Sequence, residues 1–135
     1  MTFMKKLCKL KISPYKSGSV AEFLCRMYMR MHGYQIIAKN YICGAGKKTP
    51  YGELDFVAVK DKTIVFCEVK KRQNDVDFLK ALSIKQQERI LNGGQYFMHT
   101  NPKYKNYSMR FDVFFVKLPL SIKWIKNAIY RDRIR

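Results

Sequence analysis

The chain has 135 residues, of which 47% are hydrophobic and 14% aromatic, values typical of one folded domain. Its 27 Lys and Arg residues against 10 Asp and Glu give a formal net charge of +17. This charge favours a polyanionic partner, with nucleic acid first and an anionic membrane surface second. A basic composition without any binding role is the plain alternative. The lack of an apolar run of about 18 residues excludes a membrane-spanning helix.

The cysteines, at positions 8, 25, 43 and 67, form no Cys-x-x-Cys pair, and no His stands at the spacing of zinc ligands. We therefore expect reduced, packed thiols and a cytoplasmic protein. Residues 1–12 are basic, but the continuous apolar segment of a signal peptide does not follow them.

The predicted elements begin with a basic N-terminal arm at residues 1–16. A helix follows, which Ser17 or Ser19 can cap and Gly33 can end. The apolar residues of this helix recur at helical spacing and are expected to face the core: Val20, Phe23, Leu24, Met27 and Met31.

The later elements are a short strand at 35–40, a loop at 44–52, a hairpin at 52–71, a helix at 76–99, a strand at 109–118 and a terminal helix at 121–133. The helix at 76–99 contains a candidate break at Leu82-Ser83. We expect one domain over 1–135, with 119–135 as a C-terminal helical extension. The order helix, strand, hairpin, helix, strand predicts an α/β fold with a mixed central sheet flanked by helices.

The hairpin is the most informative part of the chain. A two-residue turn at Asp61 and Lys62 would place Lys60 opposite Thr63. Both faces of the paired strands are then apolar, which predicts a central hairpin covered on both sides. Asp-Lys is not a favoured pair for a type I′ turn, and a slip of one residue would exchange the two faces.

In this register four charged side chains gather at the open end of the hairpin. Asp55 lies opposite Glu68, and Glu53 lies opposite Lys70, all on one face because side chains alternate along a strand. Opposed carboxylates repel unless a cation separates them, and Mg²⁺ prefers such oxygen ligands. Lys70 would then stabilise a phosphate or polarise a water molecule. The alternative is a solvated hairpin end with a Glu53–Lys70 ion pair.

The pattern resembles the PD-(D/E)xK nuclease superfamily, with Asp55 as the acid and Glu68-Val69-Lys70 as the ExK element. It is more closely similar to the small bacterial YraN-type family of endonuclease-like proteins, over about residues 17–117. The matching motifs are Ala21-Glu22, Gly33-Tyr34, Asn40, Gly52-Glu53-Leu54-Asp55, Glu68-Val69-Lys70-Lys71-Arg72, Lys85 and Arg110-Phe111-Asp112. The chain departs from the family at Lys71, where Thr is usual, and after Arg72, where a glycine-containing loop is usual.

The resemblance implies a restriction-endonuclease-like fold and hydrolysis of phosphodiester bonds in DNA with Mg²⁺ or Mn²⁺. By analogy with junction resolvases, the DNA would be branched. The implied catalytic residues are Glu22, Asp55, Glu68 and Lys70, the metal ligands are Asp55, Glu68 and the carbonyl of Val69, and Glu53 is a secondary candidate. Residues expected to contact DNA beside the cleft are Lys47, Lys48, Lys71, Arg72 and Lys85, with Lys103 and Lys105 placed near them. For Glu22, the alternative is an ion pair with Arg26 one turn away.

Two other functions stay open at this point. The chain would be a non-catalytic nucleic-acid-binding module with the same fold, or a basic protein bound to a membrane surface or to the ribosome. Cleavage that depends on magnesium separates the nuclease from both, and binding to liposomes separates the last two. We expect DNA rather than a membrane as the partner, and a homodimer is compatible with the sequence.

Overall fold

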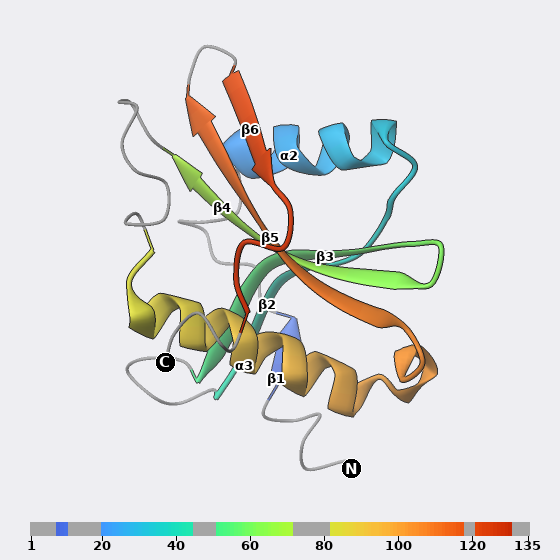
Figure 1. Ribbon diagram of the computed structural model, residues 1–135. Coiled ribbons are helices and arrows are strands. Elements are labelled where there is room, and N and C mark those ends of the chain that lie inside the picture. The colour runs from blue at the N-terminus through green and yellow to red at the C-terminus, as the bar shows by residue number, and fades with distance from the viewer. Residues whose placement is uncertain (1–7, 11–19, 45–50, 72–81, 118–120, 131–135) are drawn as a thin grey trace.

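The computed structural model describes residues 8–10, 20–44, 51–71, 82–117 and 121–130. In chain order the elements are β1 (Cys8–Leu10), α2 (Val20–Met31), β2 (Gln35–Cys43), β3 (Gly52–Lys60), β4 (Thr63–Lys71), α3 (Ile84–Thr100), the 3-10 helix η2 (Pro102–Tyr104), β5 (Ser108–Lys117) and β6 (Ser121–Ile125) (Figure 1). The six strands form one sheet in the order β1-β2-β3-β4-β5-β6. This confirms the predicted mixed α/β fold.

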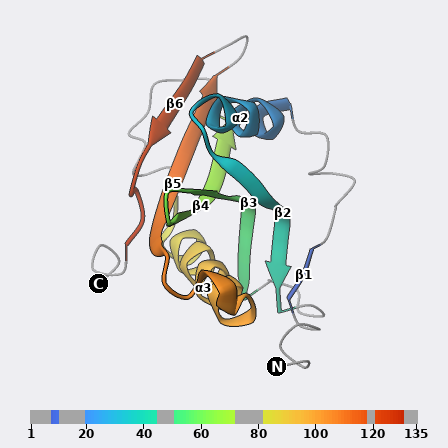
Figure 2. The same cartoon turned by 90° about the vertical axis from the view of Figure 1, so that its right-hand side faces the viewer.

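The sheet is mixed because of a single crossover. Neighbouring strands are antiparallel except β4 and β5, which are parallel. Parallel neighbours need a long connection, and here the chain between them includes α3. The two helices cover opposite faces of the sheet (Figures 1 and 2). Ile64 and Phe66 of β4 join the core with α3, whereas Val65 and Cys67 join the core with α2.

The start of α3 is set by a capping box. Ser83 Oγ accepts from the backbone N–H of Gln86 at 3.1 Å, and the Gln86 side chain accepts from the backbone N–H of Ser83 at 3.2 Å. Such reciprocal bonds satisfy two of the N–H groups that a helix start leaves unpaired. α3 therefore begins at the position of the predicted break, and residues 76–81 lie outside the described residues.

Two glycines let α3 lie directly on the beginning of β3. A Cβ atom on Gly52 would be 2.5 Å from the backbone N of Gly93, and one on Gly93 would be 3.1 Å from the backbone N of Glu53. Gly52 therefore requires a residue without a side chain, and Gly93 leaves little room for one. The close approach holds Glu53 against α3.

The orientation of α2 differs from the prediction. Its large apolar residues point outward, with exposed fractions of 59% for Val20, 51% for Phe23, 40% for Met27 and 78% for Met31. The buried residues are Ala21, Glu22, Cys25 and Met29. Small side chains such as Ala21 and Cys25 allow the helix to approach the sheet closely, which the larger residues would prevent. The predicted core stripe is therefore wrong.

The C-terminal region also differs from the prediction. Residues 121–125 form β6, antiparallel to β5, and not the start of a helix. Ser121 and Lys123 are exposed while Ile122 and Trp124 are half-buried and pack against the α2 side of the core, so the side chains follow the period of a strand. The predicted helical extension is wrong over these residues.

The N-terminal region and β2 refine two further predictions. Residues 8–10 of the predicted arm form the edge strand β1 and pair with β2. β2 extends through Cys43, beyond the predicted end at residue 40. Asn40, inside this strand, adopts a positive φ of 51°. In the part of the chain that the structure describes, α2 and α3 are too short or too polar to cross a bilayer.

Candidate functional site

The hairpin register follows the predicted turn. Lys60 pairs with Thr63, and the two turn residues Asp61 and Lys62 have φ values of 48° and 61°. Positive φ at both central residues is the geometry of a type I′ turn, which matches the twist of the flanking strands. The predicted two-residue turn is confirmed, although its residues are not those that such turns prefer.

The hairpin opens at the end away from the turn. The ladder between β3 and β4 runs as far as the pair Phe56 and Cys67. Beyond it, β3 continues beside β2 down to Gly52, while β4 continues beside β5 up to Lys71. Figure 1 shows the start of β3 and the end of β4 diverging. The next residue on each strand is a carboxylate, Asp55 or Glu68.

At this opening, the Asp55 carboxylate accepts a backbone hydrogen bond in place of a ladder partner. The backbone N–H of Val69 donates to Asp55 Oδ2 at 2.7 Å. A backbone N–H that has lost its ladder partner needs another acceptor, and a carboxylate is a strong one. The bond ties Asp55 to β4 and holds its carboxylate beside Glu68.

Glu68 and Lys70 complete the cluster. Glu68 is 8% exposed, shares a hydrogen bond with Asp55, and lies 3.2 Å from Lys70, measured from Oε2 to Nζ. Burial raises the pKa of Glu68 well above its ordinary value, the charge of Asp55 raises it further, and Lys70 opposes both. Either a proton or a divalent cation would relieve the repulsion within this pair.

Glu22 reaches the same region from α2. It is 8% exposed on the inner face of the helix. Burial raises the pKa of the Cys25 thiol to about 12, and the charges of Asp55 and Glu22 add to this rise. Burial lowers the pKa of Arg26, and Glu22 and Asp55 both oppose that change. The charges of Glu22 and Asp55 thus both affect Cys25 and Arg26. Glu22 therefore lies near the acid pair and also near Arg26.

Glu53 turns toward α3. Its Oε1 lies 3.7 Å from Arg89 Nε, whereas Lys70, its partner in the alternative interpretation of the hairpin end, lies 3.2 Å from Glu68. Lys85 precedes Arg89 by four residues and therefore lies on the same side of α3, where it is exposed. This places Lys85 along the rim that Glu53 and Arg89 form.

The other predicted DNA contacts divide into three groups. Lys71 is exposed at the end of β4, beside the acid pair. Lys47, Lys48 and Arg72 lie outside the described residues. The remaining two, Lys103 and Lys105, lie by η2 at the opposite end, where Ser108 N donates to the carbonyl of the turn residue Lys62 at 2.9 Å. Their predicted place beside the cleft is wrong.

The donor set decides whether the site suits a metal ion. Among the residues that the structure describes, no three His, Cys, Asp or Glu side chains converge on one point. The protein therefore offers two carboxylates, Asp55 and Glu68, in direct contact. Mg²⁺ is commonly held by one or two carboxylates while it keeps waters and binds substrate phosphate. The acid pair fits that arrangement.

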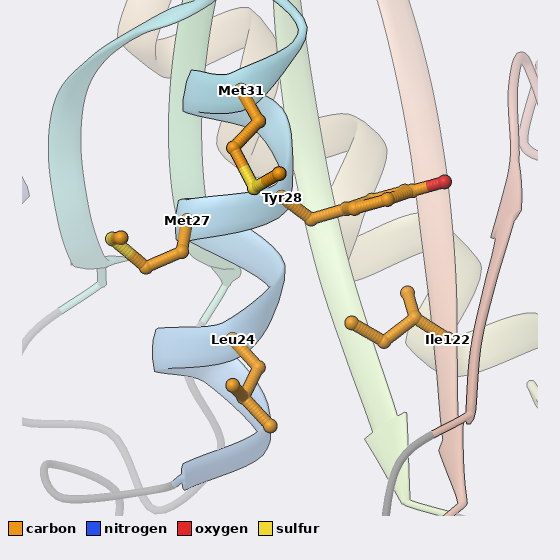
Figure 3. Close-up of a pocket in the computed structure, with 5 residues that line it drawn as sticks. All are labelled: Leu24, Met27, Tyr28, Met31 and Ile122. Atoms are coloured by element: carbon orange, nitrogen blue, oxygen red, sulfur yellow. The ribbon is translucent and has the colours of Figure 1, made fainter.

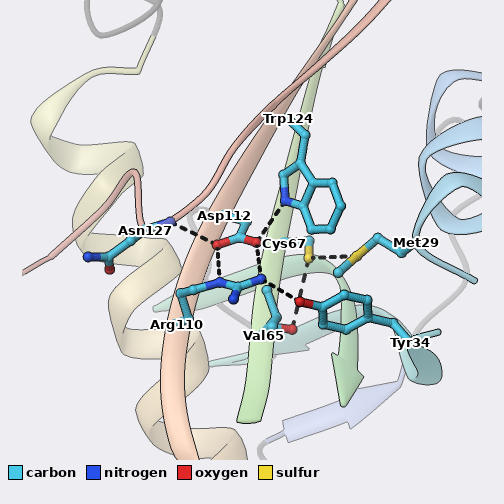
Figure 4. Close-up of polar contacts among 8 residues, drawn as sticks. All are labelled: Met29, Tyr34, Val65, Cys67, Arg110, Asp112, Trp124 and Asn127. Atoms are coloured by element: carbon cyan, nitrogen blue, oxygen red, sulfur yellow. Dashed lines mark hydrogen bonds and ion pairs between the residues drawn. The ribbon is translucent and has the colours of Figure 1, made fainter. Parts of the chain in front are cut away.

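A second buried acid was not foreseen as a centre of bonding. Asp112 is fully buried and accepts from Arg110 Nε and Nη2 at 2.9 Å each, from Trp124 Nε1 at 2.8 Å and from the backbone N–H of Asn127 at 2.9 Å (Figure 4). Arg110 also donates to the hydroxyl of Tyr34 at 3.0 Å. The two-residue spacing of Arg110 and Asp112 on one strand was the available signal. We call these five residues the Asp112 network.

The fold and site define a mixed α/β protein with a buried carboxylate pair where two strands separate. Residues 21–116 match the model described as "Uncharacterised protein family UPF0102", and the chain belongs to this family. This is the YraN type of the sequence resemblance, which is thereby confirmed at the level of the family.

Three relatives carry the UPF0102 name. The chain is 35% identical to the protein of Rhodopseudomonas palustris over 106 residues, covering 78% of this chain and 76% of the relative. It is 33% identical to that of Francisella tularensis over 114 residues, covering 82% and 92%. It is 35% identical to that of Ehrlichia ruminantium over 111 residues, covering 82% and 81%.

Among solved structures, Pyrococcus furiosus SfsA in complex with Ca²⁺ matches 80% of this chain and 60% of that chain. The match has 12% identity and a TM-score of 0.26, which is too low to support a comparison of fold or site.

Proposed function

We propose that the protein is a metal-dependent endonuclease that hydrolyses phosphodiester bonds in DNA. The observation that carries the proposal is the acid pair: two contacting carboxylates, one of them buried, with Lys70 3.2 Å from Glu68. Repulsion within such a pair is relieved by a proton or by a cation. The net charge of +17 supports a polyanionic substrate.

Asp55 and Glu68 would hold Mg²⁺ or Mn²⁺, with the carbonyl of Val69 as a further ligand. The bound ion would lower the pKa of a water molecule and offset charge on the phosphate. Glu22 would support the site from α2, and Glu53 would shape its rim through Arg89.

Lys70 has the role of a positively charged donor. Its contact with Glu68 fixes the ammonium group beside the acids, where it would hydrogen-bond to the attacking water or to a phosphate oxygen. The bond from Val69 to Asp55 keeps the carboxylate in place without rearrangement. Phosphate contacts would come from Lys71 and Lys85, and from Lys47, Lys48 and Arg72 outside the described residues.

A non-catalytic DNA-binding module with the same fold is the second candidate. It is favoured by the presence of only two convergent carboxylates among the described residues, held together by a hydrogen bond. The cytoplasm is the proposed location for either function, because Cys25 and Cys67 are free and buried.

The test is a nuclease assay on linear, nicked and four-way DNA with Mg²⁺ and with Mn²⁺. We expect cleavage by the wild type, and a loss of about 100-fold or more in Lys70→Ala, as for removal of a charge-stabilising donor. Lys103→Ala, at the other end of the sheet, is the matched control. Failure of the wild type to cut any of these DNA forms with either metal would leave the binding module as the better account.

A further inference from the structure

The outward face of α2 carries apolar residues in a regular pattern. Val20, Leu24, Met27 and Met31 follow one another at intervals of four, three and four residues. This is the a/d spacing by which one helix packs against another. The inner face of the same helix is already covered by the sheet through Ala21, Cys25 and Met29. α2 therefore presents a second apolar side that no described element covers.

A groove runs beside this face. Leu24, Met27, Tyr28 and Met31 of α2, together with Ile122 of β6, line a hollow of about 320 Å³ (Figure 3). Tyr28 lines the hollow, and its ring lies 5.9 Å from that of Trp124 in an edge contact. Trp124 in turn donates to Asp112 at 2.8 Å. These contacts with the core hold Tyr28 in place, so the hollow has its shape without a partner.

The charges at the rim select the kind of partner. Arg30 is exposed on one side of the apolar face, while Lys123 is exposed next to Ile122 on the other. Within α2 and β6, which the structure describes completely, the only acid is Glu22, and it is buried toward the sheet. The rim is therefore positive on both sides. A second copy would bring like charges together, which opposes pairing of α2 with itself.

The shape of the groove separates a helix from a membrane. A lipid surface would cover the outermost residues and leave the hollow between α2 and β6 unfilled. A partner helix instead inserts side chains spaced at i, i+3 and i+7 into such a hollow and lays its charged flanks along the rim. Methionines suit this contact because their flexible side chains adapt to the inserted residues.

We propose that the groove between α2 and β6 is a docking site for an acidic amphipathic helix of a partner protein. The apolar side of that helix would fill the hollow and pack against Met27 and Met31, and its Glu or Asp residues would pair with Arg30 and Lys123. The proposal is independent of DNA cleavage, because it uses the face of α2 opposite to Glu22.

The test uses a designed helical peptide with Leu at a and d positions and Glu elsewhere, labelled for fluorescence anisotropy. A scrambled peptide of the same composition controls for charge attraction to a protein of net charge +17. The double variant Met27→Gln/Met31→Gln removes the apolar face without changing charge. Met109→Gln/Ile84→Gln is its control, because Met109 and Ile84 are 41% and 58% exposed elsewhere on the protein.

We expect the amphipathic peptide to bind more tightly than the scrambled one, with affinity about 10-fold weaker in Met27→Gln/Met31→Gln and unchanged in the control variant. Thermal unfolding of both variants should match the wild type, since the substituted residues are exposed. Equal binding of both peptides, no binding of either, or equal affinity of both variants would overturn the proposal. The proposal would also be overturned if Met27→Gln/Met31→Gln left peptide binding unchanged but abolished self-association or binding to vesicles containing phosphatidylglycerol.

Discussion

Two buried acids on adjacent strands have opposite surroundings. Asp112 of β5 accepts four hydrogen bonds, two of them from Arg110. Glu68 of β4 instead contacts another acid, Asp55, and its main positive neighbour is Lys70. At Glu68, burial combines with the like charge of Asp55 and raises the pKa well above its ordinary value.

The difference separates a structural acid from a reactive one. When fixed donors form hydrogen bonds to every oxygen of a buried carboxylate, the carboxylate gains no further stability from a proton or a cation. On Arg110, burial alone lowers the pKa, but its bonds to Asp112 and Tyr34 outweigh burial and raise it, so Arg110 stays charged. An acid held against a second acid gains from a proton or a cation. The Asp55–Glu68 pair therefore has the properties of a site, and the Asp112 network has those of a clamp that holds β6.

The largest expected effect is on cleavage by Asp55→Asn. The variant keeps the shape of the side chain and an acceptor for the Val69 N–H, but it removes the charge that would bind the proposed metal ion. We expect divalent-dependent cleavage to fall below detection, with DNA binding equal to or tighter than that of the wild type. Gel-based cleavage and anisotropy measure the two properties, with Asp61→Asn in the exposed turn as control. If Asp55→Asn unfolds, Asp55 belongs with Asp112 as a structural acid.

The second effect is on stability. Asp112→Ala leaves Arg110 and the N–H groups of Trp124 and Asn127 without their acceptor. We expect a loss of about 3–5 kcal/mol in the free energy of unfolding, nearer the lower figure because the Arg110 side chain is 22% exposed. Urea unfolding measures this, with Glu88→Ala on the exposed side of α3 as control. A change as small as that of the control would mean that the network does not clamp β6.

The third effect concerns pH. The pKa of Glu68 is raised above its ordinary value of 4.5 in the folded protein, so folding favours its protonated form. Without metal, its contribution to stability is complete below pH 4.5 and is lost as the pH rises through the raised pKa. We expect Glu68→Gln to lose this decline and to be the more stable protein at neutral pH.

Urea unfolding of the wild type and Glu68→Gln at several pH values in EDTA measures the decline. Added Mg²⁺ should restore stability to the wild type only. Below the raised pKa of Glu68, the affinity of the wild type for Mg²⁺ should rise about 10-fold per pH unit, because a proton must leave Glu68 when the ion binds. If the free energy of unfolding varied with pH in the same way in both proteins, Glu68 would be a structural acid like Asp112.

The smallest expected effect is on the salt dependence of DNA binding. Lys71 lies beside the acid pair and Lys103 beside η2, so only Lys71 should contact phosphate near the site. Lys71→Ala should lower the slope of log affinity against log salt by about 0.9, the value for one phosphate contact on duplex DNA. Lys103→Ala should leave the slope unchanged. Equal changes in both variants would mean that DNA covers both ends of the sheet.

The sequence by itself determined the local features of this protein. The turn at Asp61-Lys62 and the apolar strands on either side of it follow from short-range patterns. Both depend on residues a few positions apart, where the period of a strand is decisive. The same register places Asp55 and Glu68 directly after the last ladder pair, Phe56 and Cys67, but the separation of the strands beyond that pair did not follow from it.

Only the tertiary structure decided the contacts between distant elements. α2 has apolar residues on two sides, and the sheet selected the side with small residues, since Ala21 and Cys25 allow the closer packing. Residues 121–125 became a strand because the edge of β5 was open and Asp112 could bind Trp124. Glu53 paired with Arg89, 36 positions away, because two glycines brought α3 onto β3. Such outcomes depend on which surfaces meet, and a pattern within one segment cannot specify them.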